Sequence, residues 1–449
     1  MIARAWLTRL VGLSLAIATG VSISPGEDAV RPLFSFDEPA AVDALVALNN
    51  LPLEVAAPPE AAAGGPQGSA LHVVGRGGDG VYAKRDAVAL AGIDWPRVRT
   101  LTFWVFRPTG LSKPTPIEVQ FMEADGKTRF WRRVDLDHSG WKHYEVPLRW
   151  FRWSTGRIPQ WNAVVRVGFY CREAGEFWLD DVAVVEASEP NADGSPAAEL
   201  STEELRDFAF PAAAGKAKLE RGKHVAVITD VAALDAAQLT AHLDKAAAVV
   251  AADLPFLGEV PQGRLVVFAD RTAYQKFTVR AAEQLNSAAA PPTSGGFTFW
   301  GIATSYWDPD YGTLRPVYLH EFIHSYLDDA LRLDNSGEWL HEGLASYYQL
   351  KFHPQDNFGD LVRNGLVARN FPPLEQVLNG KKIELASYWQ AATVIAMLLH
   401  DDAYKAKLPA LVAAFQESGS TDLGPHLDKL DKTWDAFTAD WEKFCARTY

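Results

Sequence analysis

Short runs that alternate apolar and polar side chains fill the first part of the chain. The clearest lie at residues 101–106, 117–121, 164–170 and 177–185, and turn residues separate them. Alternation of this kind is typical of half-buried antiparallel strands, and no helical pattern intervenes. The pattern predicts a β-sandwich domain over residues 25–187.

The pattern changes after residues 188–204, whose Ser, Pro, Gly and acidic composition is typical of a linker. The next segments predict strands at 223–229 and 264–269, with an Ala-rich helix at 233–254 between them. Beyond Arg315 helical periodicity dominates, at 316–331, 337–350, 385–400, 408–416 and 434–445. We therefore expect a second domain of the α+β class over residues 205–449, and a multidomain protein as a whole.

The first 24 residues have the features of a signal peptide. Arg4 and Arg9 form a basic start, and residues 10–18 are apolar and end in small side chains. This run is too short to span a bilayer comfortably, and no later segment is long and apolar enough to do so. The sequence favours a secreted or periplasmic protein over the alternatives, an uncleaved anchor or a disordered tail.

Composition narrows the classes of function. The chain has 449 residues, of which 48% are hydrophobic and 22% charged, enough apolar content for two cores. Its net charge of −13 argues against a nucleic-acid-binding protein, which needs a basic face. Two cysteines, Cys171 and Cys445, cannot build a disulfide framework, and whether they pair stays open.

The candidate chemistry begins with His320-Glu321-Phe322-Ile323-His324, an H-E-x-x-H motif on the helix expected at 316–331. Positions i and i+4 share one face of a helix, so both imidazoles can reach one metal ion. Glu321 lies one step round the helix, where it can take a proton from water at the metal. The motif alone also arises by chance in chains of this length.

A hydrolytic zinc site needs a third protein ligand and an open position. Glu342 follows His324 by eighteen positions on the next expected helix. We expect Asn335 to cap that helix, with Glu338 at its third position as in a capping box. Two helices with a short connection can pack antiparallel, which brings Glu342 over the two histidines.

HEFIH followed by WLHEGLA resembles the gluzincin zinc metallopeptidases, in particular exported bacterial proteins with a peptidase-MA-like catalytic domain. The resemblance covers about residues 205–449, although its specific motifs occupy only 320–346. It implies a thermolysin-like α+β fold, with His320, His324 and Glu342 as zinc ligands and Glu321 as general base. The zinc would lie in a cleft between a sheet lobe and a helical lobe.

The resemblance also implies an oxyanion-stabilising side chain, and Tyr388 is the candidate for this catalytic role; a tyrosine of the helix core is the alternative. Residues 297–306 would supply the edge strand that holds a substrate backbone. Ser346 stands where thermolysin-like enzymes carry an Asp, and the G-x-M-E-N motif of related aminopeptidases is absent. The absence of this motif, which recognises a free N-terminus, favours an endopeptidase over an exopeptidase.

The end of the first domain, residues 161–185, resembles the galactose-binding-like jelly rolls that serve as carbohydrate-binding modules. Eight of the fifteen tryptophans lie in residues 95–178, and we expect most of them in the core and some on a sugar-binding face. Acids at four positions could hold a structural Ca²⁺, with solvated turn carboxylates as the alternative: Asp37, Glu38, Asp180 and Asp181. Residues 75–80 match G-x-G-x-x-G but predict a glycine turn, because no crossover helix follows.

These observations predict an exported zinc metallopeptidase that hydrolyses peptide bonds in a peptide or glycoprotein, with a β-sandwich that targets it to substrate. The alternative is a carbohydrate- or cell-wall-binding protein whose metallopeptidase-like half is a silent scaffold. A zinc hydrolase acting on a non-peptide amide or a glycoconjugate is a third hypothesis.

Overall fold

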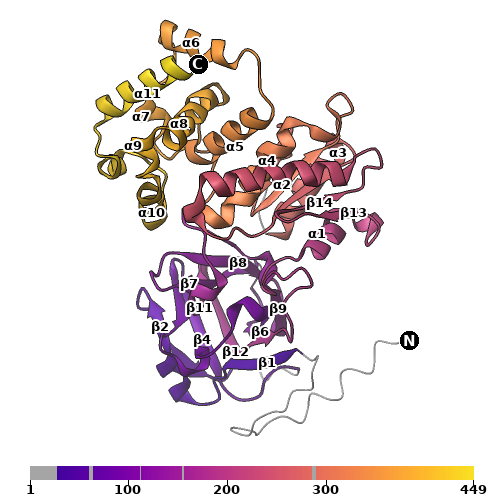
Figure 1. Ribbon diagram of the computed structural model, residues 1–449. Coiled ribbons are helices and arrows are strands. Elements are labelled where there is room, and N and C mark those ends of the chain that lie inside the picture. Colours follow the sequence, from indigo (N-terminus) through magenta and orange to yellow (C-terminus); the bar gives the residue numbers. More distant parts are fainter. Residues whose placement is uncertain (1–27, 60–63, 112, 154–155, 286–289) are drawn as a thin grey trace.

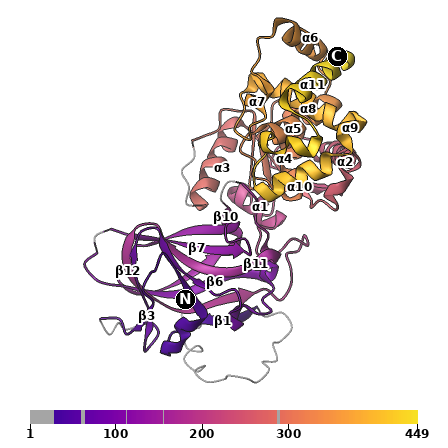
Figure 2. The same ribbon diagram turned by 90° about the vertical axis from the view of Figure 1, so that its left-hand side faces the viewer.

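A computed structural model describes residues 28–59, 64–111, 113–153, 156–285 and 290–449, so the expected signal peptide at 1–24 lies outside the described residues. The chain has a strand-rich N-terminal part and a largely helical C-terminal part, which meet along one side (Figures 1 and 2). This confirms the predicted multidomain organisation. Among the described residues, no helix combines the length and apolarity that crossing a membrane requires.

The N-terminal part is a sandwich of two antiparallel sheets. The first has the order β3-β4-β12-β6-β9, with β1 also paired to β12: β1 Ala29–Phe34, β3 Glu54–Ala56, β4 Ala70–Arg76, β6 Val98–Arg107, β9 Gly140–Pro147 and β12 Ala174–Glu186. The second has the order β10-β8-β7-β11-β5-β2: β2 Leu45–Leu48, β5 Asp79–Ala83, β7 Thr115–Glu123, β8 Arg129–Leu136, β10 Arg152–Trp153 and β11 Val164–Cys171.

Aromatic side chains fill the space between the two sheets. Phe103 of β6 meets Phe169 of β11 edge to face, with ring centroids 5.1 Å apart. Trp161 is buried and stacks on Phe130 at 3.9 Å, so this tryptophan belongs to the core. Four other tryptophans of the sandwich are half-buried and stay candidates for a sugar-binding face: Trp131, Trp141, Trp150 and Trp153.

The glycine-rich segment at 75–80 contains a glycine turn, as predicted. It joins β4 to β5, which lie in different sheets. Gly77 and Gly78 have φ angles of 93° and 82°, a region that side chains with a Cβ rarely occupy.

A five-stranded sheet forms the centre of the C-terminal part, in the order β13-β14-β15-β17-β16. Its strands are β13 Lys218–Arg221, β14 Val225–Thr229, β15 Gly263–Phe268, β16 Gly296–Phe299 and β17 Ile302–Tyr306. β14, β15 and β17 are parallel, and the two outer strands are antiparallel to their neighbours. The predicted strand at 297–306 is therefore two strands, of which only β16 is an edge.

Helices cover both faces of this sheet. Successive side chains of β15 point to opposite sides, so the clusters they join show which helices pack on each face. Leu265 and Val267 belong to the apolar cluster that includes α2 (Ala236–Asp253) and α4 (Pro316–Leu331). Val266 and Phe268 belong to the cluster that includes α1 (Thr202–Ala209) and α3 (Arg271–Gln284).

The first of these clusters continues without a break into the helical lobe, so α4 lies between the sheet and the remaining helices. Those helices are α5 Trp339–Phe352, α6 Phe358–Ala368, α7 Leu374–Val377, α8 Tyr388–His400, α9 Asp402–Lys405, α10 Leu408–Ser418 and α11 Trp434–Thr448. The start and end of α4 match the sequence prediction, and this helix carries the H-E-x-x-H motif at the boundary of the two lobes.

Candidate metal centre

α4 presents both histidines of the motif to the same side. Pro316 is its first residue, where a missing N–H costs nothing, and Phe322 and Ile323 are buried against the neighbouring elements. His320 and His324 follow one another by one turn, and their Nε2 atoms lie 3.2 Å apart. The apolar face of the helix therefore fixes the direction in which the two imidazoles point.

Glu338, and not Asn335, caps α5. Its carboxylate accepts hydrogen bonds from the backbone N–H of Leu340 and His341, at 2.7 and 3.3 Å. The prediction of Asn335 as cap was wrong, because Glu338 is buried and also accepts a hydrogen bond from the Thr421 hydroxyl at 2.8 Å, a contact no local pattern reveals. Burial raises the pKa of Glu338 to about 7.

Glu342 lies in the first turn of α5 and faces the histidines of α4. Its Oε2 lies 3.2 Å from the Nε2 of His320 and 3.6 Å from the Nε2 of His324. A tetrahedral zinc ion with bonds of about 2.0–2.1 Å separates its ligand atoms by about 3.3 Å. Among the described residues, these three form the group of His, Cys, Asp and Glu side chains that is close enough to hold a metal ion. The donor types and spacing fit zinc.

The charges at the three ligands also favour a cation. Burial alone would raise the pKa of Glu342, but the two histidines outweigh it and hold the pKa well below its usual range. Burial lowers the pKa of His324, whereas Glu342 and other nearby carboxylates raise it to about 9. A buried carboxylate that stays ionised attracts positive charge, which a proton or a metal ion can supply.

Glu321 lies beside this set and is held by the edge strand β16. The Thr298 hydroxyl lies 2.7 Å from Oε2 of Glu321 and 3.0 Å from its backbone oxygen. A Cβ on Gly296 would lie 2.5 Å from Cγ of Glu321, so the strand can approach this closely only with glycine there. Burial raises the pKa of Glu321. Neither Thr298 nor Gly296 belongs to a sequence motif, so only the structure reveals their contacts with Glu321.

Tyr388 begins α8 and lies next to the ligands. Its ring stacks parallel to that of His320, with centroids 6.3 Å apart and an interplanar angle of 5°. Burial raises its pKa, and the hydrogen bond from its hydroxyl to Glu342 raises it further. The geometry places Tyr388 within reach of a group bound at the metal position, although it also belongs to the packed start of α8.

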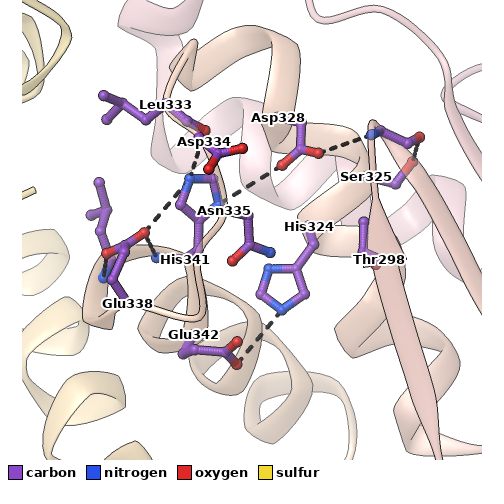
Figure 3. Close-up of polar contacts among 12 residues, drawn as sticks. Thr298, His324, Ser325, Asp328, Leu333, Asp334, Asn335, Glu338, His341 and Glu342 are labelled. Carbon is purple, nitrogen blue, oxygen red and sulfur yellow. Dashed lines mark hydrogen bonds and ion pairs between the residues drawn. The ribbon is translucent and has the colours of Figure 1, made fainter. Parts of the chain in front are cut away.

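His341 points away from the ligands (Figure 3). Its Nε2 lies 3.1 Å from the backbone oxygen of Leu333, and burial lowers its pKa to about 3, so the ring is neutral and donates this hydrogen bond. Asp328 lies 4.0 Å from the other ring nitrogen. His341 therefore connects α5 to the α4–α5 loop and does not belong to the candidate ligand set.

A cleft of about 1010 Å³ opens over these residues. The three ligands, Glu321 and Tyr388 lie on its wall, together with Ser346. Apolar side chains from β16, α6 and α8 also line it: Phe297, Phe358, Leu361 and Trp389. The cleft is large enough for several residues of an extended chain.

Two other features expected from the sequence are the candidate calcium ligands and the two cysteines. Asp180 is buried and accepts a hydrogen bond from the backbone N–H of Phe36 at 3.0 Å, and burial raises its pKa to about 6, with Asp181 and Asp37 adding to the effect. A calcium ion at these acids stays a prediction. Cys171 and Cys445 are both buried and free, and they belong to different apolar clusters.

No family model matches the chain, and no curated protein matches it. Solved structures that resemble it include the family 11 carbohydrate-binding module of Clostridium thermocellum in complex with a β-1,3-1,4-mixed-linked tetrasaccharide. That module is 16% identical, the match covers 35% of this chain and 96% of the module, and the TM-score is 0.27. The CBM22-1 xylan-binding domain of Paenibacillus barcinonensis is 13% identical over 37% of this chain and 98% of that domain, with a TM-score of 0.26. The strand pairing establishes the sandwich independently, and the gluzincin resemblance stays a prediction from the motifs.

Proposed function

We propose that the protein is a zinc metallopeptidase, acting as an endopeptidase, with the zinc held by His320, His324 and Glu342. The observation that carries the proposal is the triangle of Nε2, Nε2 and Oε2 atoms, whose edges of 3.2, 3.2 and 3.6 Å suit a tetrahedral ion with one position left open. The cleft in front of the triangle leaves room for a peptide. A thermolysin-like fold and the expected export are parts of this proposal.

In the proposed hydrolysis, Glu321, Tyr388 and the strand β16 each have a separate role. A zinc ion bound here supplies a Lewis acid that activates water at neutral pH. Glu321, fixed by Thr298, accepts the proton of the attacking water and delivers it to the leaving amine. Tyr388 donates a hydrogen bond to the oxygen that gains negative charge as the carbonyl is attacked. The free edge of β16 aligns the substrate backbone beside Glu321.

The decisive experiment compares the wild type with Glu321→Gln in zinc analysis and in cleavage of an unstructured protein. We expect about one zinc per chain in both and cleavage only by the wild type, because Gln cannot carry the proton. Zinc-free protein, or unchanged cleavage by the variant, would contradict the mechanism. Zinc binding without any cleavage would favour the silent-scaffold alternative or a non-peptide substrate.

A groove in the sandwich supports carbohydrate binding as a second function. It has a volume of about 590 Å³ and lies over the second sheet. On its floor the Tyr82 hydroxyl donates to Gln120 at 2.9 Å, and Gln120 donates to Glu118 at 2.9 Å. Such fixed donors and acceptors beside a tyrosine ring suit the hydroxyl groups and the apolar face of a sugar.

The charge of the groove indicates which saccharides to test. Arg129, Arg166 and Arg172 line it, whereas Glu118 is its one acidic residue. This excess of positive charge favours saccharides that carry carboxylates. We expect the full chain carrying Glu321→Gln to bind acidic glycans on an array. Adding Arg129→Ala should weaken this binding, and Lys142→Ala on the other sheet should not. Equal binding by all three proteins would exclude the groove as the site that binds these glycans.

A further inference from the structure

The loop at residues 332–338 joins the two helices that carry the metal ligands. His320 and His324 precede it on α4, and Glu342 follows it on α5. Two of the three edges of the ligand triangle therefore depend on how this loop holds α5 against α4. The β-sandwich contacts this loop directly.

The first contact is made by the backbone. Residues 156–158 of the sandwich lie antiparallel to residues 332–334, with Arg157 paired to Leu333. The Ile158 N–H donates to the Arg332 oxygen at 2.9 Å, and the Asp334 N–H donates to the Gly156 oxygen at 2.6 Å. The loop is thereby paired, like a strand, with a segment of the other domain.

The second contact is a buried ion pair. Glu123, at the end of β7, has only 6% of its side chain exposed, and its Oε1 lies 2.8 Å from Nη2 of Arg332. Arg157 lies 3.2 Å from the other carboxylate oxygen of Glu123. The Glu123 carboxylate also accepts the Gln160 N–H at 2.8 Å, so the acid joins both segments.

The third contact is the indole of Trp153, which donates to Oδ1 of Asp334 at 3.0 Å. From there the loop connects to the metal centre. The oxygen of Leu333 accepts the hydrogen bond of His341, the residue before Glu342 (Figure 3). Leu333 is buried in the core that contains both helices.

We infer that the β-sandwich is a structural part of the metal centre: its contacts with residues 332–334 hold the loop that sets Glu342 against His320 and His324, so that Trp153 and Glu123 act as positioning residues for metal binding. The inference rests on the proposed zinc site. It assigns the sandwich a second role, independent of any sugar.

Trp153→Phe is the mildest test, since it removes the indole N–H and keeps an aromatic ring. The matched control is Trp150→Phe. Trp150 lies at the same domain boundary but packs on Phe208 of α1, with ring centroids 4.9 Å apart. Zinc affinity is measured on the full chain by competition with a chromophoric chelator. Hydrogen exchange of the amides of residues 332–338 is measured on metal-free protein.

We expect Trp153→Phe to weaken zinc binding about threefold to tenfold and to accelerate exchange in the loop, while Trp150→Phe changes neither. Unchanged loop exchange in Trp153→Phe, equal effects of the two variants, or faster exchange with unchanged zinc affinity would each overturn the inference. A wild type that binds no zinc refutes the proposed function instead, and the exchange data then still decide whether the sandwich holds the loop.

Discussion

Removing the hydroxyl of Thr298 is the most direct test of the proposed general base, Glu321, because it changes one hydrogen-bond donor to that residue. Thr298→Val keeps the shape of the side chain and removes the single O–H that Oε2 and the backbone oxygen of Glu321 share, at 2.7 and 3.0 Å. Only 8% of Thr298 is exposed, so water cannot readily replace the donor from the strand side. The change therefore acts on Glu321 without touching a metal ligand.

Its magnitude follows from the hydrogen bond that is lost. Burial raises the pKa of Glu321, and the Thr298 hydroxyl acts in the opposite direction by stabilising the carboxylate. A hydrogen bond to a charged group contributes about 1.5–3 kcal/mol, and one pKa unit corresponds to about 1.4 kcal/mol. Taking the lower end of this range, we expect Thr298→Val to raise the pKa of Glu321 by about one unit.

The assay is the pH dependence of kcat/KM for a peptide substrate. A base must be ionised to act, so a raised pKa moves the acid limb of the profile to higher pH by about one unit and lowers kcat/KM about tenfold below the limb. Zinc content should not change. Thr304→Val is the matched control, because its buried hydroxyl donates to the Phe297 oxygen at 2.5 Å in the same hairpin, away from Glu321.

Two results would refute this reasoning. The acid limb of Thr298→Val could coincide with that of the wild type, in which case Glu321 is not the group that the limb reports. Alternatively, Thr304→Val could move the limb as far, in which case the effect comes from a weakened hairpin.

Three further predictions concern packing and charge. In Gly343→Ala the new Cβ would lie 2.9 Å from the backbone oxygen of Ala391 on α8. We therefore expect the free energy of unfolding by denaturant to fall by about 1–3 kcal/mol and zinc binding to weaken. Gly359→Ala on α6, the control, should change neither quantity. Asp180→Asn should raise the melting temperature of the sandwich at pH 8 but not at pH 4. Burial raises the pKa of Asp180 to about 6, so the wild type loses stability as pH rises through that value. If the variant instead melts below the wild type when both are in calcium at pH 8, Asp180 helps to bind that ion. Partial burial raises the pKa of Asp193, but hydrogen bonds from Ser195 and Thr202 outweigh it and lower the pKa to about 2. Asp193→Asn should therefore cost about 1 kcal/mol at pH 7, and the difference from wild type should shrink as pH falls from 4 through 2, with unchanged pH dependence arguing against these bonds.

The sequence predicted many of the elements whose residues are buried on one regular face, although it did not predict α3. α4 was predicted from Pro316 to Leu331 because its apolar positions recur at helical spacing and a proline marks its start. β13 was missed because Lys218–Arg221 is a half-exposed edge strand without apolar alternation. The sequence predicts the hairpin of β16 and β17 as one strand because its turn, Trp300-Gly301 with φ angles of 46° and 67°, has only one residue typical of a turn.

In the candidate site, one ligand distance follows from local sequence, and the other two depend on contacts between distant residues. The edge between His320 and His324 follows from helix geometry alone, so a sequence motif can predict it. The edges to Glu342 depend on contacts that join residues far apart in the chain. Arg332 meets Glu123 across 209 positions, and Gly343 packs against Ala391 closely enough to exclude a Cβ. On the inference above, a chain with the same three ligands but a larger residue at 343, or without the sandwich, would lose the convergence of those ligands. For this reason the candidate metal centre can be located from the motifs, whereas its ability to bind zinc has to be judged from the packing around α5.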